Sequence, residues 1–110
     1  MSRESYGKSE VMKLEGALNA QTVGGLRSEL EKIFEDPPQV LVFDLENVQD
    51  IDSSGVGALI SALKRMRTEG GDVRVLHLQG IVQKLFQLLH LDRAMTICDD
   101  LESAVAPLHT

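Results

Sequence analysis

Short apolar runs alternate with amphipathic stretches along this 110-residue chain, and the alternation is what most limits its fold. The amphipathic stretches repeat their apolar side chains at helical spacing, whereas the runs have the length of strands. Strands that alternate with helix-length crossovers form a mostly parallel sheet with right-handed connections. We therefore predict a single small α/β domain, in which helices pack against a mostly parallel central sheet of about four strands. The expected strands are residues 11–14, 40–45, 73–78 and 94–97, and the expected helices begin near Asn19, Asp52, Ile81 and Asp99.

Local composition sets the expected limits of the domain and of its first helix. Residues 1–7 are polar and predict a loose N-terminal tail, too polar to supply a further strand, so that the domain covers residues 8–110. Asn19 is the expected N-cap of the first helix, and Pro37-Pro38 end that helix. Residues 46–50 are polar and predict a loop after the second strand, whose continuous apolar character is typical of a strand covered on both faces.

The charge and the cysteine content exclude several classes of function. The net charge of −6 argues against a nucleic-acid partner, which needs a basic face. Cys98 is the only cysteine, so no internal disulfide can form and a reducing, cytoplasmic location is expected. The sequence has no apolar stretch of about 18 residues and no secretory signal. Neither membrane insertion nor export is therefore expected.

The stretch Asp52-Ser53-Ser54-Gly55-Val56-Gly57, called the serine motif below, carries the strongest functional signal. It opens a helix after a predicted strand, where unpaired backbone N–H groups and the helix dipole favour a negative group such as a phosphate. An Asp or Ser at this point also caps any helix, a contribution of about 1 kcal/mol. Two glycines in a first turn cost roughly 1 kcal/mol each relative to alanine, and the close approach of another backbone is one reason to keep them. Spacing alone leaves both a simple helix cap and a phosphorylation switch open.

Catalytic motifs do not fit the serine motif. A nucleophile elbow needs glycine where Asp52 stands, and the dinucleotide fingerprint needs glycine where Ile60 stands. The chain has no P-loop, and the scattered histidines His77, His90 and His109 predict no metal site and only a formal Ser-His-Asp triad. We therefore expect no enzymatic activity, no cofactor and no metal.

Four carboxylates offer one further alternative, because they lie on or shortly after the same predicted strand. They are Asp44, Glu46, Asp50 and Asp52. If they gather near one strand end they fit a hard cation. A solvated acidic rim is the simpler interpretation and the one we favour.

Residues 45–57 resemble the anti-sigma factor antagonists of the STAS domain family, in which a hydrophobic strand, a loop and Asp-Ser-Ser/Thr-Gly-Leu/Val-Gly open a helix. Residues 14–22 resemble the Gly-x-Leu-Asp-x-x-Thr turn of that family. Gly70-Gly71-Asp72 and residues 82–86 also match in kind, so the likeness runs from about residue 8 to residue 108. Asn19 stands where the family usually has aspartate, which removes one charge near the docking face that the resemblance implies.

The resemblance implies a phosphorylation switch with no catalysis by the protein itself. In such proteins the unphosphorylated form binds a serine-kinase anti-sigma factor and so frees the sigma factor. The kinase then phosphorylates the first serine after the aspartate, here Ser53, the modified form dissociates, and a PP2C-type phosphatase resets it. Ser54 is then a supporting cap or a secondary phosphorylation site, and Gly55 and Gly57 leave space for the partner. The implied partner-binding residues are Asn19, Asp50, Asp52, Ser54, Gly55, Val56 and Gly57.

Other roles on the same fold stay open. One is a regulatory scaffold subunit of a lipid-transport or similar membrane assembly, and another is a partner-switching complex outside sigma-factor control. Scaffold members of the family often lack the complete serine motif, so its presence here favours a kinase substrate. A hydrolase is the weakest alternative.

Overall fold

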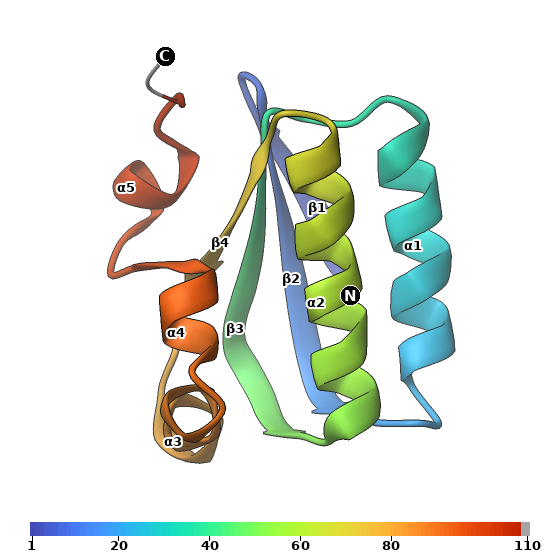
Figure 1. The fold of residues 1–110 in the computed structure, drawn as a ribbon, viewed down its shortest axis with the longest axis vertical. Coiled ribbons are helices and arrows are strands. Elements are labelled where there is room, and N and C mark those ends of the chain that lie inside the picture. The colour runs from blue at the N-terminus through green and yellow to red at the C-terminus, as the bar shows by residue number, and fades with distance from the viewer. Residues whose placement is uncertain (109–110) are drawn as a thin grey trace.

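A five-stranded sheet in the order β1-β2-β3-β4-β5 forms the centre of the computed structural model, which describes residues 1–108 (Figure 1). Strand β1 pairs antiparallel with β2, and all the other neighbouring strands pair in parallel. This confirms the predicted α/β class, with one strand more than the expected four. His109, one of the three histidines considered above, lies outside the described residues. The strands are β1 (Ser2–Tyr6), β2 (Ser9–Leu18), β3 (Val40–Ile51), β4 (Asp72–Leu76) and β5 (Thr96–Cys98).

The additional strand is β1, and it shows that the predicted loose tail over residues 1–7 is wrong. It pairs with β2 from Ser2 opposite Lys13 to Tyr6 opposite Ser9. Gly7, at a positive φ of 60°, lies in the turn that joins the two strands. Four of the five β1 residues are exposed, so the strand has no buried face and no alternation of apolar residues. Backbone hydrogen bonds with β2 order it, together with ion pairs between the two strands such as Lys13–Glu4.

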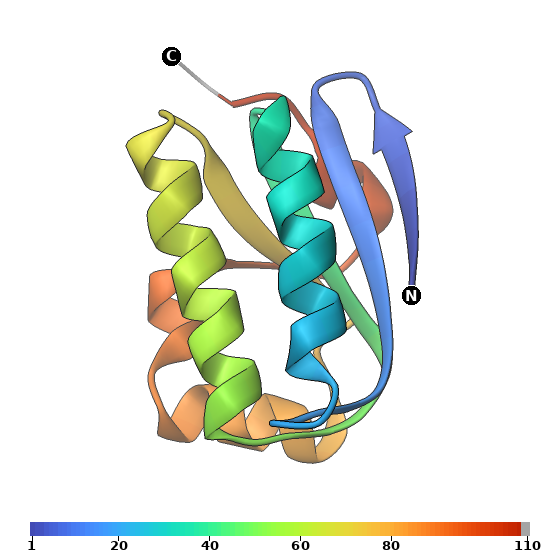
Figure 2. The ribbon, with the colours of Figure 1, turned by 90° about the vertical axis from the view of Figure 1, so that its right-hand side faces the viewer.

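The helices cover the two faces of the sheet unequally. Helices α1 (Val23–Glu35) and α2 (Ser53–Thr68) lie side by side on one face (Figure 2). They share the larger hydrophobic core with α3 (Gly80–Leu88) and α4 (Leu91–Ala94), whereas α5 (Leu101–Val105) covers a smaller core on the opposite face. Alternate residues of β3 enter the two cores. The apolar run at its start is therefore buried on both faces, as predicted.

Strand β3 continues through residues 46–50, where the sequence predicted a loop. Its second half pairs with β2 from Asn47 opposite Glu15 to Ile51 opposite Leu18, with irregular register in between. Such bulges break the period-2 alternation that identifies a strand in a sequence. Val48 and Ile51 are nevertheless buried, so this half of β3 also contributes to the core.

Among the described residues, none of the helices is both long enough and apolar enough to cross a membrane.

Candidate functional site

The carboxyl ends of β2 and β3 lie side by side and bring two predicted site segments together. Leu18, the last residue of β2, pairs with Ile51, the last residue of β3. The backbone N–H of Asp52 continues this pairing and donates to the carbonyl oxygen of Leu18 at 3.0 Å. The turn that begins at Asn19 and the serine motif therefore leave the sheet from adjacent points on its lower edge (Figure 1).

Asp52 is the N-cap of α2. Its Oδ1 atom accepts hydrogen bonds from the backbone N–H groups of Ser54 at 2.9 Å and Gly55 at 3.2 Å, and its backbone is extended. This is the usual geometry of an N-cap, because the carboxylate satisfies two of the N–H groups that lack a partner within the helix. Of the Asp and Ser residues expected to cap this helix, Asp52 is the N-cap, and Ser54 takes part through its backbone N–H. Ser53, the first helical residue, is exposed, and Ser54 is half-buried.

The two glycines of the serine motif have different surroundings. A Cβ atom at Gly55 would lie 2.5 Å from the carbonyl oxygen of Leu18 and 2.8 Å from Cγ1 of Ile51. The close backbone approach that we expected at this position is therefore made by β2 of the same chain. A Cβ atom at Gly57 would meet only Arg27 Nη2, at 3.8 Å. Of the two glycines, only Gly57 leaves open space at the surface.

Asn19 closes the turn between β2 and α1. Its Oδ1 atom accepts from the backbone N–H groups of Gln21 at 2.9 Å and Thr22 at 3.1 Å. The Thr22 hydroxyl accepts from the Asn19 N–H at 2.9 Å and donates to the Ala17 carbonyl at 2.7 Å. Helix α1 begins at Val23 with Thr22 at its N-cap position, so the prediction that Asn19 is the N-cap is wrong. An aspartate would accept the same two hydrogen bonds, so the departure from the family pattern costs the turn nothing.

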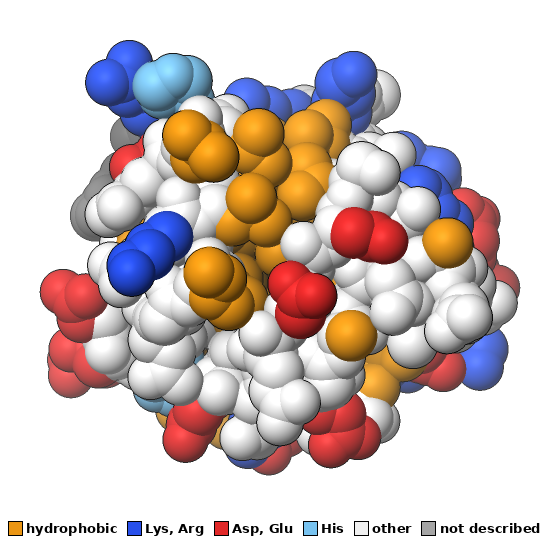
Figure 3. Space-filling model, turned by 90° about the horizontal axis from the view of Figure 1, so that it is seen from below, with side chains coloured by type: hydrophobic (Ala, Val, Ile, Leu, Met, Phe, Trp, Pro, Cys, Tyr) orange, Lys and Arg blue, Asp and Glu red, His pale blue; other side chains and the backbone are white. Residues whose placement is uncertain are grey.

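An apolar patch beside the serine motif was missed in the sequence. Ile81 and Leu88 of α3 are 63% and 75% exposed, and together with the half-buried Leu85 they form what we call the α3 patch. A groove of about 230 Å³ runs between this patch and the end of β3, and Asp50 and Ile51 line its other side. Figure 3 shows hydrophobic side chains gathered on this lower face with acidic side chains beside them. The apolar stripe of α3 is too wide for one buried helix face, and this width was the signal in the sequence that could have predicted the patch.

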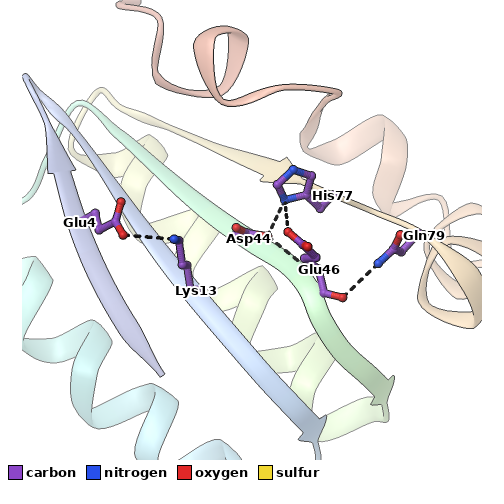
Figure 4. Close-up of polar contacts among 6 residues, drawn as sticks. All are labelled: Glu4, Lys13, Asp44, Glu46, His77 and Gln79. Carbon is purple, nitrogen blue, oxygen red and sulfur yellow. Dashed lines mark hydrogen bonds and ion pairs between the residues drawn. The ribbon is translucent and has the colours of Figure 1, made fainter.

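The four carboxylates, Asp44, Glu46, Asp50 and Asp52, form two separate groups rather than one rim. Asp50 and Asp52 lie at the lower edge and are exposed. Asp44 lies six residues earlier on β3, about 20 Å away at the rise of an extended strand. It contacts His77, with 2.9 Å between Oδ1 and Nδ1, and Glu46 Oε2 lies 3.2 Å from the same nitrogen (Figure 4).

The fold and the site together define a small α/β domain whose distinctive surface is an exposed helix start. The chain belongs to the STAS domain family, whose model matches residues 3–104.

Relatives with similar sequences carry names from one class of regulator. The chain is 26% identical over 99 residues to an anti-sigma F factor antagonist of Paenibacillus polymyxa, with 89% of this chain and 85% of the relative covered. It is 26% identical over 91 residues to an anti-sigma-B factor antagonist of Staphylococcus aureus, with 83% and 84% covered.

Solved structures share the fold at lower sequence identity. An anti-sigma factor antagonist from Mycobacterium paratuberculosis superposes with a TM-score of 0.84 at 22% identity, with 94% of this chain and 88% of that chain covered. Unphosphorylated SpoIIAA, another anti-sigma factor antagonist, superposes with a TM-score of 0.73 at 21% identity, with 93% and 90% covered.

Proposed function

We propose that this protein is an anti-sigma factor antagonist that is switched by phosphorylation of Ser53. Its unphosphorylated form binds a serine-kinase anti-sigma factor in the cytoplasm, phosphorylation releases it, and a PP2C-type phosphatase restores binding. The observation that carries the proposal is the exposed Ser53 hydroxyl, which directly follows the Asp52 cap at the start of α2. The names of the relatives support the same role, and SpoIIAA has been solved in both unphosphorylated and phosphorylated forms.

The position of Ser53 suits a switch that changes a surface and leaves the fold intact. A phosphate adds about −1.5 to −2 charges at neutral pH. The positive end of the α2 dipole and the exposure of Ser53 make this charge tolerable to the folded protein. A partner that approaches the same turn meets the phosphate together with the carboxylates of Asp50 and Asp52. Like-charge repulsion and steric overlap then oppose binding.

The α3 patch gives such a partner an apolar surface to bury. Interfaces gain most of their affinity from a central apolar cluster, with polar groups around it. Asp50 lines the groove beside Ile81 and is two residues from the cap, so a partner that covers this groove also reaches the serine motif. We propose that the contact surface comprises this patch and Asn19, Asp50, Asp52, Ser54, Val56 and Gly57. Gly55 is buried beneath this surface and lets α2 lie close to β2.

Mass spectrometry after incubation with the cognate kinase and ATP tests the phosphorylation site. We expect a single phosphate on the wild-type protein, none on Ser53→Ala, and an unchanged modification on Ser54→Ala, which serves as the matched control. Full phosphorylation of Ser53→Ala would overturn the assignment.

Calorimetry with the same kinase tests whether charge at this position controls binding. We expect Ser53→Asp to weaken the complex at least about tenfold, a loss of about 1.4 kcal/mol. Ser61→Asp adds the same charge two turns further along α2 and should bind nearly as the wild type does. Equal affinities of the wild type and Ser53→Asp would contradict the proposed repulsion.

A separate experiment identifies the pathway. The identity of the kinase that co-purifies with this protein decides between sigma-factor control and another partner-switching pathway.

A further inference from the structure

Parallel pairing of β3 with β4 brings His77 to two of the four grouped carboxylates, Asp44 and Glu46, a contact that the sequence did not predict. Asp44 on β3 is the register partner of Leu76, the last residue of β4, and His77 follows directly. His77 has a left-handed backbone with φ of 59°, and its imidazole lies beside the Asp44 carboxylate although 33 residues separate them. Glu46 completes the group, which we call the Asp-Glu-His cluster (Figure 4).

The donor atoms of the cluster are spaced as a small metal ion requires. His77 Nδ1 lies 2.9 Å from Asp44 Oδ1 and 3.2 Å from Glu46 Oε2. One donor atom from each residue can be chosen so that all three lie within 4.8 Å of one another. A tetrahedral ion with ligands about 2.1 Å away places its ligand atoms roughly 3.4 Å apart. Only small movements of the three side chains would bring their donor atoms to the spacing that one coordinated ion requires.

Further hydrogen bonds hold the Asp44 side chain and the Glu46 backbone in place. The Asp44 side chain is only 8% exposed, and its Oδ1 also accepts from the backbone N–H of Glu46 at 3.1 Å. The side-chain amide of Gln79 donates to the carbonyl oxygen of Glu46 at 3.0 Å, which ties β3 to the segment after β4. Supports of this kind orient metal ligands and reduce the entropy lost on binding.

Charge and access also favour a cation. Two carboxylates face one imidazole, and the ammonium group of Lys13, which neighbours Asp44 across the strands, is paired with Glu4 at 3.1 Å. The side chains of Glu46 and His77 are 58% and 38% exposed, so an ion can enter from solvent and keep water in its remaining positions.

We propose that the Asp-Glu-His cluster binds one divalent transition-metal ion of the Zn²⁺ type. One imidazole nitrogen and two carboxylate oxygens are donors that Zn²⁺ accepts readily, whereas Ca²⁺ needs six to eight oxygens and Mg²⁺ an octahedron dominated by oxygen. His77 binds through the lone pair of Nδ1 with its proton on Nε2. The bound ion links β3 to the end of β4, on a part of the sheet separate from the serine motif.

Titration of the chelator-treated, full-length protein tests this proposal. Zn²⁺ in a calorimeter should bind once per chain, and Co²⁺ should produce the visible absorption of a site with mixed nitrogen and oxygen ligands. We expect Glu46→Gln and His77→Asn each to weaken Zn²⁺ binding at least about tenfold. Asparagine tolerates the left-handed backbone of residue 77, and Glu46 is exposed, so both variants should fold.

The same titration includes a control variant and outcomes that would contradict the proposed metal site. His90→Asn removes another exposed histidine with a left-handed backbone, at φ of 58°, and should bind Zn²⁺ as the wild type does. Excess Mg²⁺ should not displace Co²⁺. A wild-type protein that binds no Zn²⁺, or one whose affinity is unchanged by both Glu46→Gln and His77→Asn, would overturn the proposal and leave the cluster as a hydrogen-bonded contact.

Discussion

At the scale of single residues, Gly55 shows how a position in the serine motif is fixed by the fold. Strand β2 passes so close to the start of α2 that a side chain at residue 55 would overlap the carbonyl of Leu18. The same strand accepts the hydrogen bond of Asp52, so the cap and the glycine hold α2 against the sheet edge together. Gly55 therefore positions Ser53 by bringing the helix close to the strand.

Alanine substitutions separate this role of Gly55 from that of Gly57. Gly55→Ala should lower the free energy of unfolding by about 1–3 kcal/mol, because overlap with a backbone oxygen cannot be relieved by a rotamer change. Gly57→Ala is the matched control, since its Cβ meets nothing closer than 3.8 Å and alanine favours the helix by up to about 1 kcal/mol. Urea denaturation of the two variants measures both effects. A Gly55→Ala variant as stable as Gly57→Ala would show that movement of α2 relieves the overlap with Leu18.

Asp52 offers a second test at the same scale. Asp52→Ala removes the acceptor for two backbone N–H groups and should cost about 1 kcal/mol of stability. Asp52→Asn keeps an oxygen in the same place and should retain most of that stability. Thermal unfolding of both variants measures the difference. If Asp52→Asn were as unstable as Asp52→Ala, the charge of the carboxylate, acting on the helix dipole, would matter more than the hydrogen bonds.

At the scale of elements, α5 is a short helix fastened to the sheet by Arg74 and by the Ser9 hydroxyl, which donates to the Val105 carbonyl oxygen at 3.1 Å. Nη1 of Arg74, on β4, donates to the carbonyl oxygens of Ser103 at 3.1 Å, Ala104 at 3.0 Å and Ala106 at 2.6 Å. The helix covers the smaller core, where Cys98 is buried. Burial raises the pKa of the Cys98 thiol above its ordinary value, which the nearby Arg74 charge partly offsets. The reactivity of Cys98 therefore reports on the attachment of α5.

Removal of this arginine should expose the thiol. Arg74→Met leaves three carbonyl groups without their donor, so α5 should open more often and Cys98 should react several-fold faster with a disulfide reagent at neutral pH. In the wild type the raised pKa keeps the Cys98 thiol protonated. The rate of its reaction with the reagent should therefore increase only above the pH at which a free cysteine ionises. Arg93→Met, at an exposed position on α4, is the control. An unchanged rate in Arg74→Met would show that apolar packing and the Ser9–Val105 hydrogen bond hold α5 without the arginine.

Elements with a buried, periodic apolar face were predicted from the sequence, whereas β1 and the second half of β3, which show no such period, were not. Helix α2 and the first half of β3 have apolar patterns that agree with their burial. Strand β1 is exposed along nearly its whole length, and bulges interrupt the pairing of β3 in residues 46–50, so neither shows the period of a strand. The pairing of Asp44 with His77 depends on strand register, which no local pattern encodes. The serine motif was found because its residues are contiguous.

At the scale of the whole molecule, the proposed phosphorylation site at Ser53 lies apart from the hydrophobic cores, so that a charge at Ser53 can change the surface without changing the cores. The larger core lies between the sheet and α1, α2 and α3, with Ala58 and Leu59 as the first fully buried side chains of α2 beyond Gly55. Ser53 precedes them at the exposed start of that helix. A charge at Ser53 therefore acts on the lower face, which includes the α3 patch, and leaves the cores untouched.

Amide chemical shifts of Ser53→Asp test this separation over the entire chain. We expect shifts to move in the serine motif, in the turn at Asn19 and along the groove near Ile81, because these segments lie on the same lower face. Shifts from β4, β5 and α5 should stay in place, and the melting temperature should change little, since an acidic residue in the first turn suits the helix dipole. Ser61→Asp should perturb only the exposed side of α2. Widespread chemical-shift changes in β4 and α5 would mean that a charge at Ser53 rearranges the sheet. Repulsion of a partner at the surface would then not be needed to explain the proposed switch.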